Sequence, residues 1–212
     1  MVKRRNSAFL LLSFIGVLLA WRWASRHRAL PCPTWLAWIL EGSFFDQLLG
    51  TQTTLNRMGL QADQRVLEIG PGPGRLLIPA ARRVLPGGEV VGLDIQSGML
   101  ERLRVRAATS GVTNLTAVLG DATQPHFPPD SFDVIFLCTV LGEIPDRTAA
   151  LQQAYSALKP GGRLSITEIF PDPHYQSRAA VQRLAESAGF CLREVVGPRF
   201  FFTATFVKEG RR

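Results

Sequence analysis

A glycine-rich turn and a later aspartate are the residues whose types and spacing most clearly suggest chemistry. Residues 66–74 read VLEIGPGPG, an apolar run that breaks into three alternating glycines. Glycine is needed where the backbone takes a positive φ or approaches a ligand closely. Asp94 follows Gly74 by twenty residues, at the end of the next apolar run. An acid at that point can accept hydrogen bonds from ribose hydroxyls, so the pair predicts a nucleoside-binding crevice.

Spacing within the turn separates two classes of nucleotide-binding protein. A dinucleotide fingerprint places its third glycine three residues after the second, but Arg75 stands there in this chain. An acid, Glu68, also lies two residues before the first glycine, where dinucleotide folds usually carry an apolar residue. Both features argue against an NAD(P)-binding Rossmann oxidoreductase, which we keep as an alternative. A catalytically inactive scaffold is the second alternative.

From Arg65 onward, short apolar runs alternate with segments of helical periodicity. The predicted strands are residues 65–69, 89–94, 115–119, 133–138 and 162–169, and the predicted helices are residues 74–85, 97–109, 146–158 and 175–188. This alternation predicts an α/β, Rossmann-like, doubly wound sheet with helices on both faces. Two further runs, CLREVV and FFFTATFV, flank Gly197 and Pro198 and predict a C-terminal hairpin.

Five motifs in order give the chain a family resemblance over roughly residues 50–208. They are VLEIGPGPG at 66–74, VVGLDIQSGML at 90–100, GDA at 120–122, FDVIF at 132–136 and LKPGGRL at 158–164. With them the sequence resembles the class I S-adenosylmethionine (SAM) methyltransferases. It is most similar to the branch with ubiquinone/menaquinone C-methyltransferases and bacterial phospholipid N-methyltransferases. The resemblance implies a seven-stranded sheet whose last two strands form the antiparallel hairpin.

The resemblance also implies a set of cofactor contacts. The backbone at Gly70, Gly72 and Gly74 would pass beneath the methionine and ribose of SAM. Glu68 would lie near the amino acid end and order the turn, while Asp94 would bind both ribose hydroxyls. The expected adenine contacts are Ile95 and Met99 on its faces, and Asp121 with the backbone of Ala122 at its amino edge.

Two loops are expected to surround the methyl acceptor. They are CTVLGEIPD, after the fourth strand, and EIFPDPHYQS, after the fifth. They carry four residues that can exchange or orient a proton, namely Glu143, Glu168, His174 and Tyr175. We take Glu143 and His174 as the candidate catalytic residues. Solvent exposure at a helix start is the alternative for Glu143, and a lid or a plain surface position is the alternative for His174 and Tyr175.

Several other residues are interpreted as structural. His126 is expected to be an exposed loop histidine, so His126→Ala should leave SAM binding intact while Asp94→Ala abolishes it. Asp133 is expected to support the start of its strand, and residues 159–162 to form a tight turn. The 3 cysteines are far apart and include no C-x-x-C pair, so neither a disulfide framework nor a metal site is predicted.

Residues 1–28 are predicted to be a membrane anchor. Residues 6–21 are uncharged and mostly apolar, and arginines flank them. As a helix they would be ~24 Å long, shorter than the ~30 Å hydrocarbon core, so spanning the bilayer and lying in it both stay open. A cleaved signal peptide is the alternative. Residues 29–60 are expected to form a helical lead-in and residues 61–212 the methyltransferase domain.

The net charge of +7 arises at the N-terminus. Six of the 24 basic residues lie in residues 1–28, which hold no acid, so 18 basic and 17 acidic residues remain, a net charge of +1. Nucleic-acid binding needs a basic face, so no nucleic-acid partner is expected. We instead expect a small-molecule or lipid-like acceptor at a membrane surface, with the catalytic domain in the cytoplasm, where SAM is made. The oligomeric state is left open.

Overall fold

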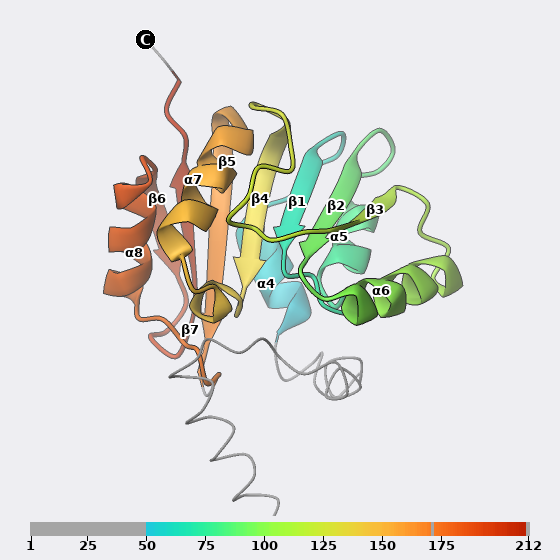
Figure 1. The fold of residues 1–212 in the computed structure, drawn as a ribbon, viewed down its shortest axis with the longest axis horizontal. Helices are drawn as coiled ribbons and strands as arrows, with labels where there is room; N and C mark the ends of the chain where they lie inside the picture. Colours follow the sequence, from blue (N-terminus) through green and yellow to red (C-terminus); the bar gives the residue numbers. More distant parts are fainter. Residues whose placement is uncertain (1–49, 171, 211–212) are drawn as a thin grey trace, which may run out of the picture.

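Seven strands form one sheet in the order β3–β2–β1–β4–β5–β7–β6. A computed structural model describes residues 50–170 and 172–210. The strands are β1 (Arg65–Ile69), β2 (Glu89–Asp94), β3 (Leu115–Leu119), β4 (Phe132–Cys138), β5 (Leu158–Ile169), β6 (Cys191–Val196) and β7 (Phe201–Val207). The first five strands run parallel, and β7 pairs antiparallel with both β5 and β6. The predicted α/β sheet and its C-terminal hairpin are therefore confirmed (Figure 1).

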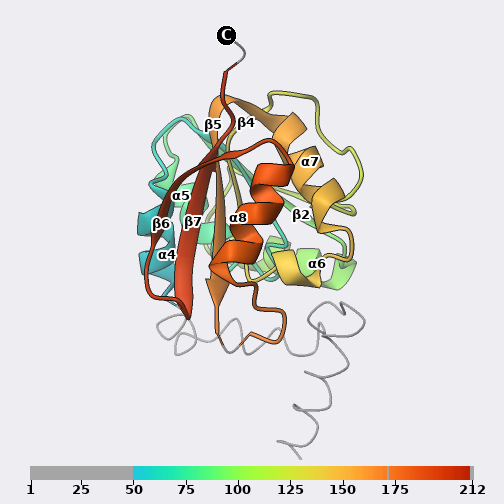
Figure 2. The same ribbon diagram turned by 90° about the vertical axis from the view of Figure 1, so that its left-hand side faces the viewer.

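Helices cover both faces of this sheet. They are α4 (Thr51–Met58), α5 (Leu77–Arg83), α6 (Ser97–Thr109), the 3-10 helix η2 (Leu141–Glu143), α7 (Arg147–Ala157) and α8 (Arg178–Ser187). Figure 2 shows α4 and α5 on one side of the sheet and α7 and α8 on the other.

Alternation along each strand supplies one core to each face, because successive side chains of a strand point to opposite sides. In β4, Val134 and Phe136 pack into the cluster under α4, α5 and α6. Ile135 and Leu137 pack into the cluster under α7 and α8. Burial on both faces is what a parallel sheet between helical layers requires.

Some boundaries differ from those predicted, for local reasons. The helix predicted from residue 175 begins at Arg178, because the Ser177 side chain accepts a hydrogen bond from the Ala180 N–H and caps it there. The turn predicted at residues 159–162 belongs to β5, because Gly161 N–H donates to the Lys208 carbonyl and Lys208 N–H to the Gly162 carbonyl. Residues 120–131, all described, form turns rather than a helix between β3 and β4.

Asp133 has the structural role that its position suggested. Its carboxylate accepts from the Arg65 N–H at 2.8 Å and from Lys159 Nζ at 2.7 Å. The Asp133 side chain thereby connects the starts of three neighbouring strands, β1, β4 and β5.

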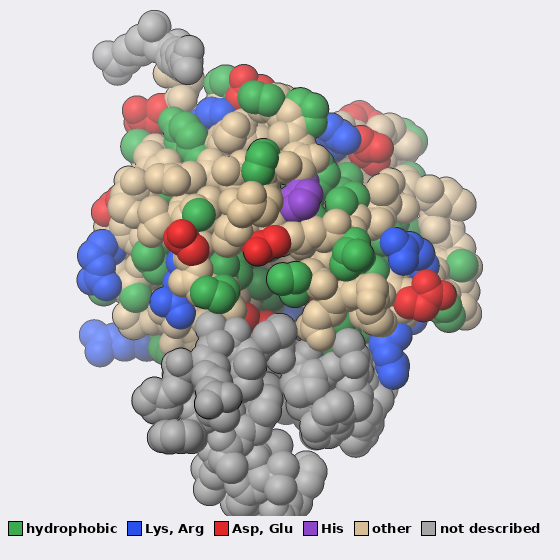
Figure 3. Space-filling view, viewed as in Figure 1, with side chains coloured by type: hydrophobic (Ala, Val, Ile, Leu, Met, Phe, Trp, Pro, Cys, Tyr) green, Lys and Arg blue, Asp and Glu red, His purple; other side chains and the backbone are tan. Residues whose placement is uncertain are grey.

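The predicted anchor, residues 1–28, lies outside the described residues, and so does the lead-in up to residue 49. Its described end is α4, whose Leu55 and Met58 are buried on the domain as expected. Within the described residues, no helix combines the length and apolar character that a membrane span needs. Figure 3 shows acidic and basic side chains intermixed over one face of the domain.

Candidate functional site

The carboxyl ends of the parallel strands meet at one edge of the sheet, the lower edge in Figure 1. Ile69, Asp94, Cys138 and Ile169 are the last residues of β1, β2, β4 and β5. Open α/β sheets bind their ligands at this edge. Every predicted site residue on the described chain lies at the end of one of these strands or of β3, or in the segment that follows it.

The three glycines of the turn have different physical reasons to be glycine. All have positive φ: 71° at Gly70, 52° at Gly72 and 86° at Gly74. A Cβ at Gly70 would lie 2.5 Å from Val140 Cγ2, and a Cβ at Gly74 would lie 2.4 Å from Leu103 Cδ1. A Cβ at Gly72 would meet no atom within 4 Å. Two glycines therefore permit close packing of the protein, and Gly72 is the one that borders open space.

Asp94 and the glycine turn are joined directly. The Gly72 N–H donates to Asp94 Oδ2 at 3.1 Å, and the Gln96 N–H donates to Oδ1 at 2.9 Å. The side chain is buried, with 7% of its surface exposed. Burial raises the pKa of Asp94, and the N–H groups of Gln96, Gly72 and Ile95 oppose that rise. A fixed carboxylate beside an open glycine is the arrangement that ribose hydroxyls require.

Glu68 is a buried acid beneath the turn. It is 3% exposed, and its Oε2 has no hydrogen-bond partner among the described residues. Burial raises its pKa well above the ordinary value, the Arg75 guanidinium opposes the rise, and the Asp94 carboxylate adds to it. A buried oxygen without a partner costs free energy unless something satisfies it. Glu68 therefore fits the predicted place beside the cationic, hydrogen-bond-donating end of SAM.

Arg75 is a site residue that the sequence did not reveal. Its Nη1 donates to Thr51 Oγ1 of α4 at 2.9 Å, and its Nη2 lies 3.4 Å from Cys138 Sγ. Burial raises the pKa of the Cys138 thiol to about 11. Arg75 thus connects α4, the glycine turn and the end of β4. In the sequence, only its position directly after Gly74 indicated that Arg75 lies near the site.

The residues assigned to the adenine differ in exposure. Ile95, directly after β2, is 60% exposed, so its side chain is accessible to a planar ligand. Met99 is almost fully buried in the first turn of α6. Asp121 is exposed, and its Oδ1 accepts from the Thr123 N–H at 2.9 Å. Their contacts with adenine stay a prediction.

His126 supports the Asp121 segment, a role that sequence reasoning missed. It is exposed, as expected, but its Nε2 lies 2.8 Å from the Asp121 carbonyl oxygen. Its ring also packs on Gly120, where a Cβ would lie 2.4 Å from His126 Cε1. His126 therefore fixes the backbone next to the predicted adenine contact.

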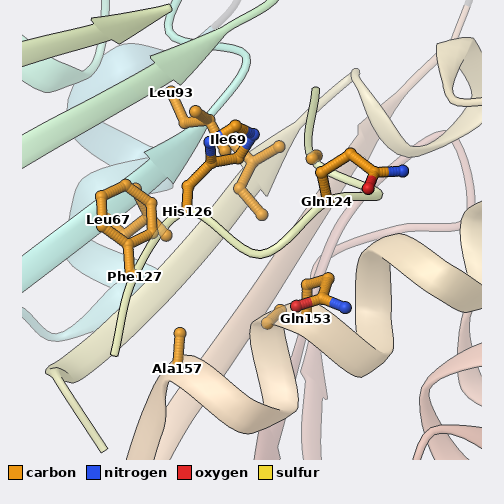
Figure 4. A pocket seen from close by; sticks show the side chains of 10 residues that line it. Leu67, Ile69, Leu93, Gln124, His126, Phe127, Gln153 and Ala157 are labelled. Carbon is orange, nitrogen blue, oxygen red and sulfur yellow. The ribbon is translucent and has the colours of Figure 1, made fainter. Parts of the chain in front are cut away.

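A small cavity lies beside His126, between the sheet and α7 (Figure 4). Its volume is about 20 Å³, which is room for about one water molecule. The lining residues are Leu67, Ile69, Leu93, Ala122, Gln124, His126, Phe127, Gln153, Ala154 and Ala157. It is too small for a nucleoside, so it is not the predicted cofactor crevice.

The two acceptor loops bring the candidate catalytic residues together. His174 Nδ1 lies 3.7 Å from Glu143 Oε1. His174 is only 5% exposed, so the alternative that it is a surface residue is wrong. Its backbone N–H donates to the Asp172 carboxylate at 2.7 Å. Tyr175 instead reaches away, and its hydroxyl donates to the Arg199 carbonyl.

Glu168 lies fully buried at the end of β5. Its Oε2 accepts from the Gln176 N–H at 3.0 Å, and its Oε1 has no hydrogen-bond partner among the described residues. Burial raises the pKa of Glu168 from 4.5 to about 8, the Gln176 N–H opposes this, and Asp172 and Glu143 add to it. We call Glu143, Glu168 and His174 the acceptor cluster.

The loop after β4 is held in an unusual conformation. Thr139 has a φ of 57°, which is rare for a β-branched residue. Its N–H donates to the Thr167 carbonyl at 2.9 Å, and Arg147 donates to the carbonyls of Leu141 and Gly142. Such local strain persists only where the surroundings enforce it, and it is frequent at functional sites.

Together, this sheet order, the glycine turn and the strand-end aspartate have the arrangement of a Rossmann-like nucleoside-binding domain. Residues 66–162 match the family model described as "Methyltransferase domain". Over these residues the chain is similar to methyltransferase domains.

Two curated relatives match about half of this chain. Nocamycin O-methyltransferase from Saccharothrix syringae is 39% identical over 108 residues, which are 51% of this chain and 39% of the relative. A ubiquinone/menaquinone biosynthesis C-methyltransferase from Pectobacterium carotovorum subsp. carotovorum (strain PC1) is 37% identical over 117 residues, 55% of this chain and 47% of the relative. The chain thus spans less than half the length of either.

The fold is shared over a longer stretch. A SAM-dependent methyltransferase from Aquifex aeolicus superimposes with a TM-score of 0.78, covering 84% of this chain and 100% of the other. Its sequence is 21% identical, so the likeness shows the fold alone.

Proposed function

We propose that this protein is a membrane-associated methyltransferase that uses SAM to methylate a small or lipid-like acceptor, such as a quinone precursor or a phospholipid headgroup. The observation that carries the proposal is the bond between the Gly72 N–H and the buried Asp94 carboxylate, beside open space. The two curated relatives are named for O- and C-methylation of small molecules.

The residues on the cofactor side of the site would contribute by positioning SAM. When bound, SAM supplies an electrophilic methyl group. Asp94 would hold the ribose, and the unpartnered Glu68 Oε2 would accept from the amino group. Val140 packs against Gly70, so the loop after β4 is held close to the cofactor turn. Positioning two reactants in this way accounts for much of the rate gain in a displacement reaction.

The acceptor cluster contains side chains that can exchange a proton. Glu168 has a pKa of about 8, so it exchanges protons near neutral pH, and its Oε1 is available for a hydrogen bond. His174 and Glu143 stand next to each other in the facing loop segments. We infer that these groups orient a hydroxyl, an amine or an activated carbon and take up its proton as the methyl is transferred.

The N-terminal sequence supports an amphiphilic acceptor and a membrane location. An apolar run at residues 6–21 is flanked by arginines, with Trp21 and Trp23 at its end. Trp and Arg favour the headgroup layer of a bilayer. Tethering raises the effective concentration of the domain toward lipid-like molecules. We infer a cytoplasmic catalytic domain, because SAM is made there.

The decisive experiment incubates the full chain with isotopically labelled methyl donor and extracts of membrane lipids and quinones, and then identifies labelled products by mass spectrometry. We expect one labelled lipid-soluble product with the native chain and far less of it with Asp94→Asn. Asp130→Asn is the matched control, because Asp130 is exposed, lies before β4 at the opposite end of the sheet and pairs with Lys208. Equal labelling by both variants would refute the proposed site.

Thermal shift separates the two alternatives. SAM should raise the melting temperature, because a ligand that binds the native state stabilises it, whereas NAD(P) should not. Stabilisation by NAD(P) alone would favour an oxidoreductase. Stabilisation by SAM without any labelled product would favour an inactive scaffold.

A further inference from the structure

The turn between β6 and β7, residues 197–200, is fixed by groups from other segments. Phe170 N–H donates to the Phe200 carbonyl at 2.7 Å. The Tyr175 hydroxyl donates to the Arg199 carbonyl, and the Arg178 guanidinium donates to the Gly197 carbonyl. The backbone of this turn therefore has a defined position relative to the end of β5 and to α8.

This well-held turn presents aromatic and basic side chains to the outside. Phe200 is 61% exposed, and Phe170, bonded to it through the backbone, is 55% exposed. Arg199, which precedes Phe200 in the turn, is exposed as well. We call Phe170, Arg199 and Phe200 the aromatic edge. Single exposed apolar residues are ordinary, but two phenylalanines on paired backbone beside an arginine form a patch of the kind that contacts membranes.

Among the described residues, two further arginines lie close to the aromatic edge. Arg57 donates to the Phe201 carbonyl at 3.3 Å and stacks over the Phe201 ring at 4.3 Å. The guanidinium of Arg178 lies 5.5 Å from the Phe202 ring centroid. Asp172, two residues after Phe170, is half-buried, and its carboxylate accepts a hydrogen bond from the backbone N–H of His174.

The aromatic edge lies at the same end of the domain as the predicted site. Phe170 follows Glu168 of the acceptor cluster by two residues at the end of β5. The β6–β7 turn lies at the lower end in Figures 1 and 2, where the parallel strands also end.

The described chain also begins at this end. A Cβ at Gly50 would lie 3.0 Å from Phe201 Cε1, so Gly50 packs on the ring next to Phe200. The 49 residues before it, with the apolar run and its basic flanks, thus join the domain beside the aromatic edge.

We propose that the aromatic edge docks on the surface of an anionic bilayer, with Phe170 and Phe200 in the interface and Arg199 at the anionic headgroups, so that the acceptor cluster faces the lipid. This rests on the membrane association of the proposed function. The docking proposal adds to that function because it specifies which end of the domain contacts the bilayer. An acceptor would then pass from the interface into the site along the end of β5.

Photocrosslinking of the full chain tests this orientation. The residue p-benzoylphenylalanine is incorporated in place of Phe200, and the protein is irradiated with vesicles of equal parts phosphatidylglycerol and phosphatidylcholine. Mass spectrometry then identifies what is attached at position 200. Incorporation in place of Leu85 is the matched control, since Leu85 is also exposed but precedes β2 at the opposite end of the sheet.

We expect lipid adducts at position 200 in several-fold excess over position 85, and fewer with vesicles of phosphatidylcholine alone. A second probe at Phe170 should give the same result, and stabilisation by SAM verifies that each labelled protein is folded. An adduct with residues 1–49 of the chain, an adduct with a second copy, or equal lipid labelling at positions 200 and 85 would each overturn the proposal. Because crosslinking requires no turnover, its failure is distinguishable from a failure of the methyl-transfer assay.

Discussion

Gly142 and the backbone of His174 are in contact that leaves no room for a side chain. A Cβ at position 142 would lie 1.9 Å from the His174 carbonyl oxygen. Gly142 belongs to the short helix η2 after β4, whereas His174 follows β5. Glycine at this one position therefore lets the two acceptor loops approach each other and places His174 beside Glu143.

Gly142→Ala should separate these loops and disturb methyl transfer. Overpacking of this kind typically costs about 1–3 kcal/mol. We expect a loss of kcat of at least tenfold with little change in the Kd for SAM, because the glycine turn after β1 is untouched. Gly210→Ala is the control, since a Cβ there meets no atom within 4 Å. Unchanged kcat in Gly142→Ala would contradict a catalytic role for the His174 loop.

Asp94→Asn should weaken SAM binding while the fold persists. The substitution keeps the shape of the side chain but removes the charge that the Gly72 and Gln96 N–H groups stabilise. Hydrogen bonds to charged groups contribute about 1.5–3 kcal/mol, so the Kd measured by calorimetry should rise by roughly one to two orders of magnitude. Asp130→Asn should bind like the native chain. Native-like affinity in Asp94→Asn would exclude the proposed ribose contact.

Glu168→Gln should change how stability depends on pH. The pKa of Glu168 is raised to about 8 in the fold from 4.5, so the native state holds a proton that the unfolded state releases. Glu168 should therefore make its full stabilising contribution to the native chain below about pH 4.5. Between about pH 4.5 and 8, the native chain's free energy of unfolding should fall relative to that of the variant. The expected slope is at most ~1.4 kcal/mol per pH unit.

Urea unfolding of both proteins at a series of pH values measures this difference. Glu68 and Asp94 also have raised pKa values, but they are present in both chains, so the comparison isolates Glu168. Parallel curves over this pH range would show that Glu168 is not held protonated.

Arg75→Met should destabilise the domain more than Arg83→Met. Both arginines bond to α4, Arg75 through Thr51 and Arg83 through Gln52 and Asn56. The Arg75 charge also limits the rise in the pKa of buried Glu68. The hydrogen bonds of Arg83, in contrast, are exposed to solvent. We expect a loss of ~1–3 kcal/mol for Arg75 and below ~1 kcal/mol for Arg83, measured by urea denaturation. Adding Glu68→Gln to Arg75→Met should recover part of the loss, and no recovery would argue against their coupling.

His126→Ala should weaken SAM binding modestly, unlike the expectation from sequence. The bond from its Nε2 to the Asp121 carbonyl steadies the predicted adenine segment. A neutral hydrogen bond contributes about 0.5–1.5 kcal/mol, so the Kd should rise about twofold to tenfold. Gln153→Ala is the control, because Gln153 lines the same cavity from α7. Equal Kd values for the two variants would instead support the expectation from sequence that His126 is an exposed loop residue without effect on SAM binding.

Local sequence patterns were sufficient to predict the strands and the cofactor turn. The predicted strand at residues 65–69 and the helix at 97–109 coincide with β1 and α6, because strand alternation and helical spacing are properties of neighbouring residues. The turn at residues 70–74 and Asp94 were also predictable, since nucleoside binding needs glycine and an acid at fixed distances along the chain.

What the sequence by itself determined, then, was the order of elements, the family resemblance and which strand ends carry polar groups. Only the tertiary structure decided that Gly72, unlike Gly70 and Gly74, borders open space, that Arg75 connects α4 with β4 and that His174 is buried against Glu143. These relationships join residues tens of positions apart. They depend on how loops from different strands pack together, which no local spacing encodes.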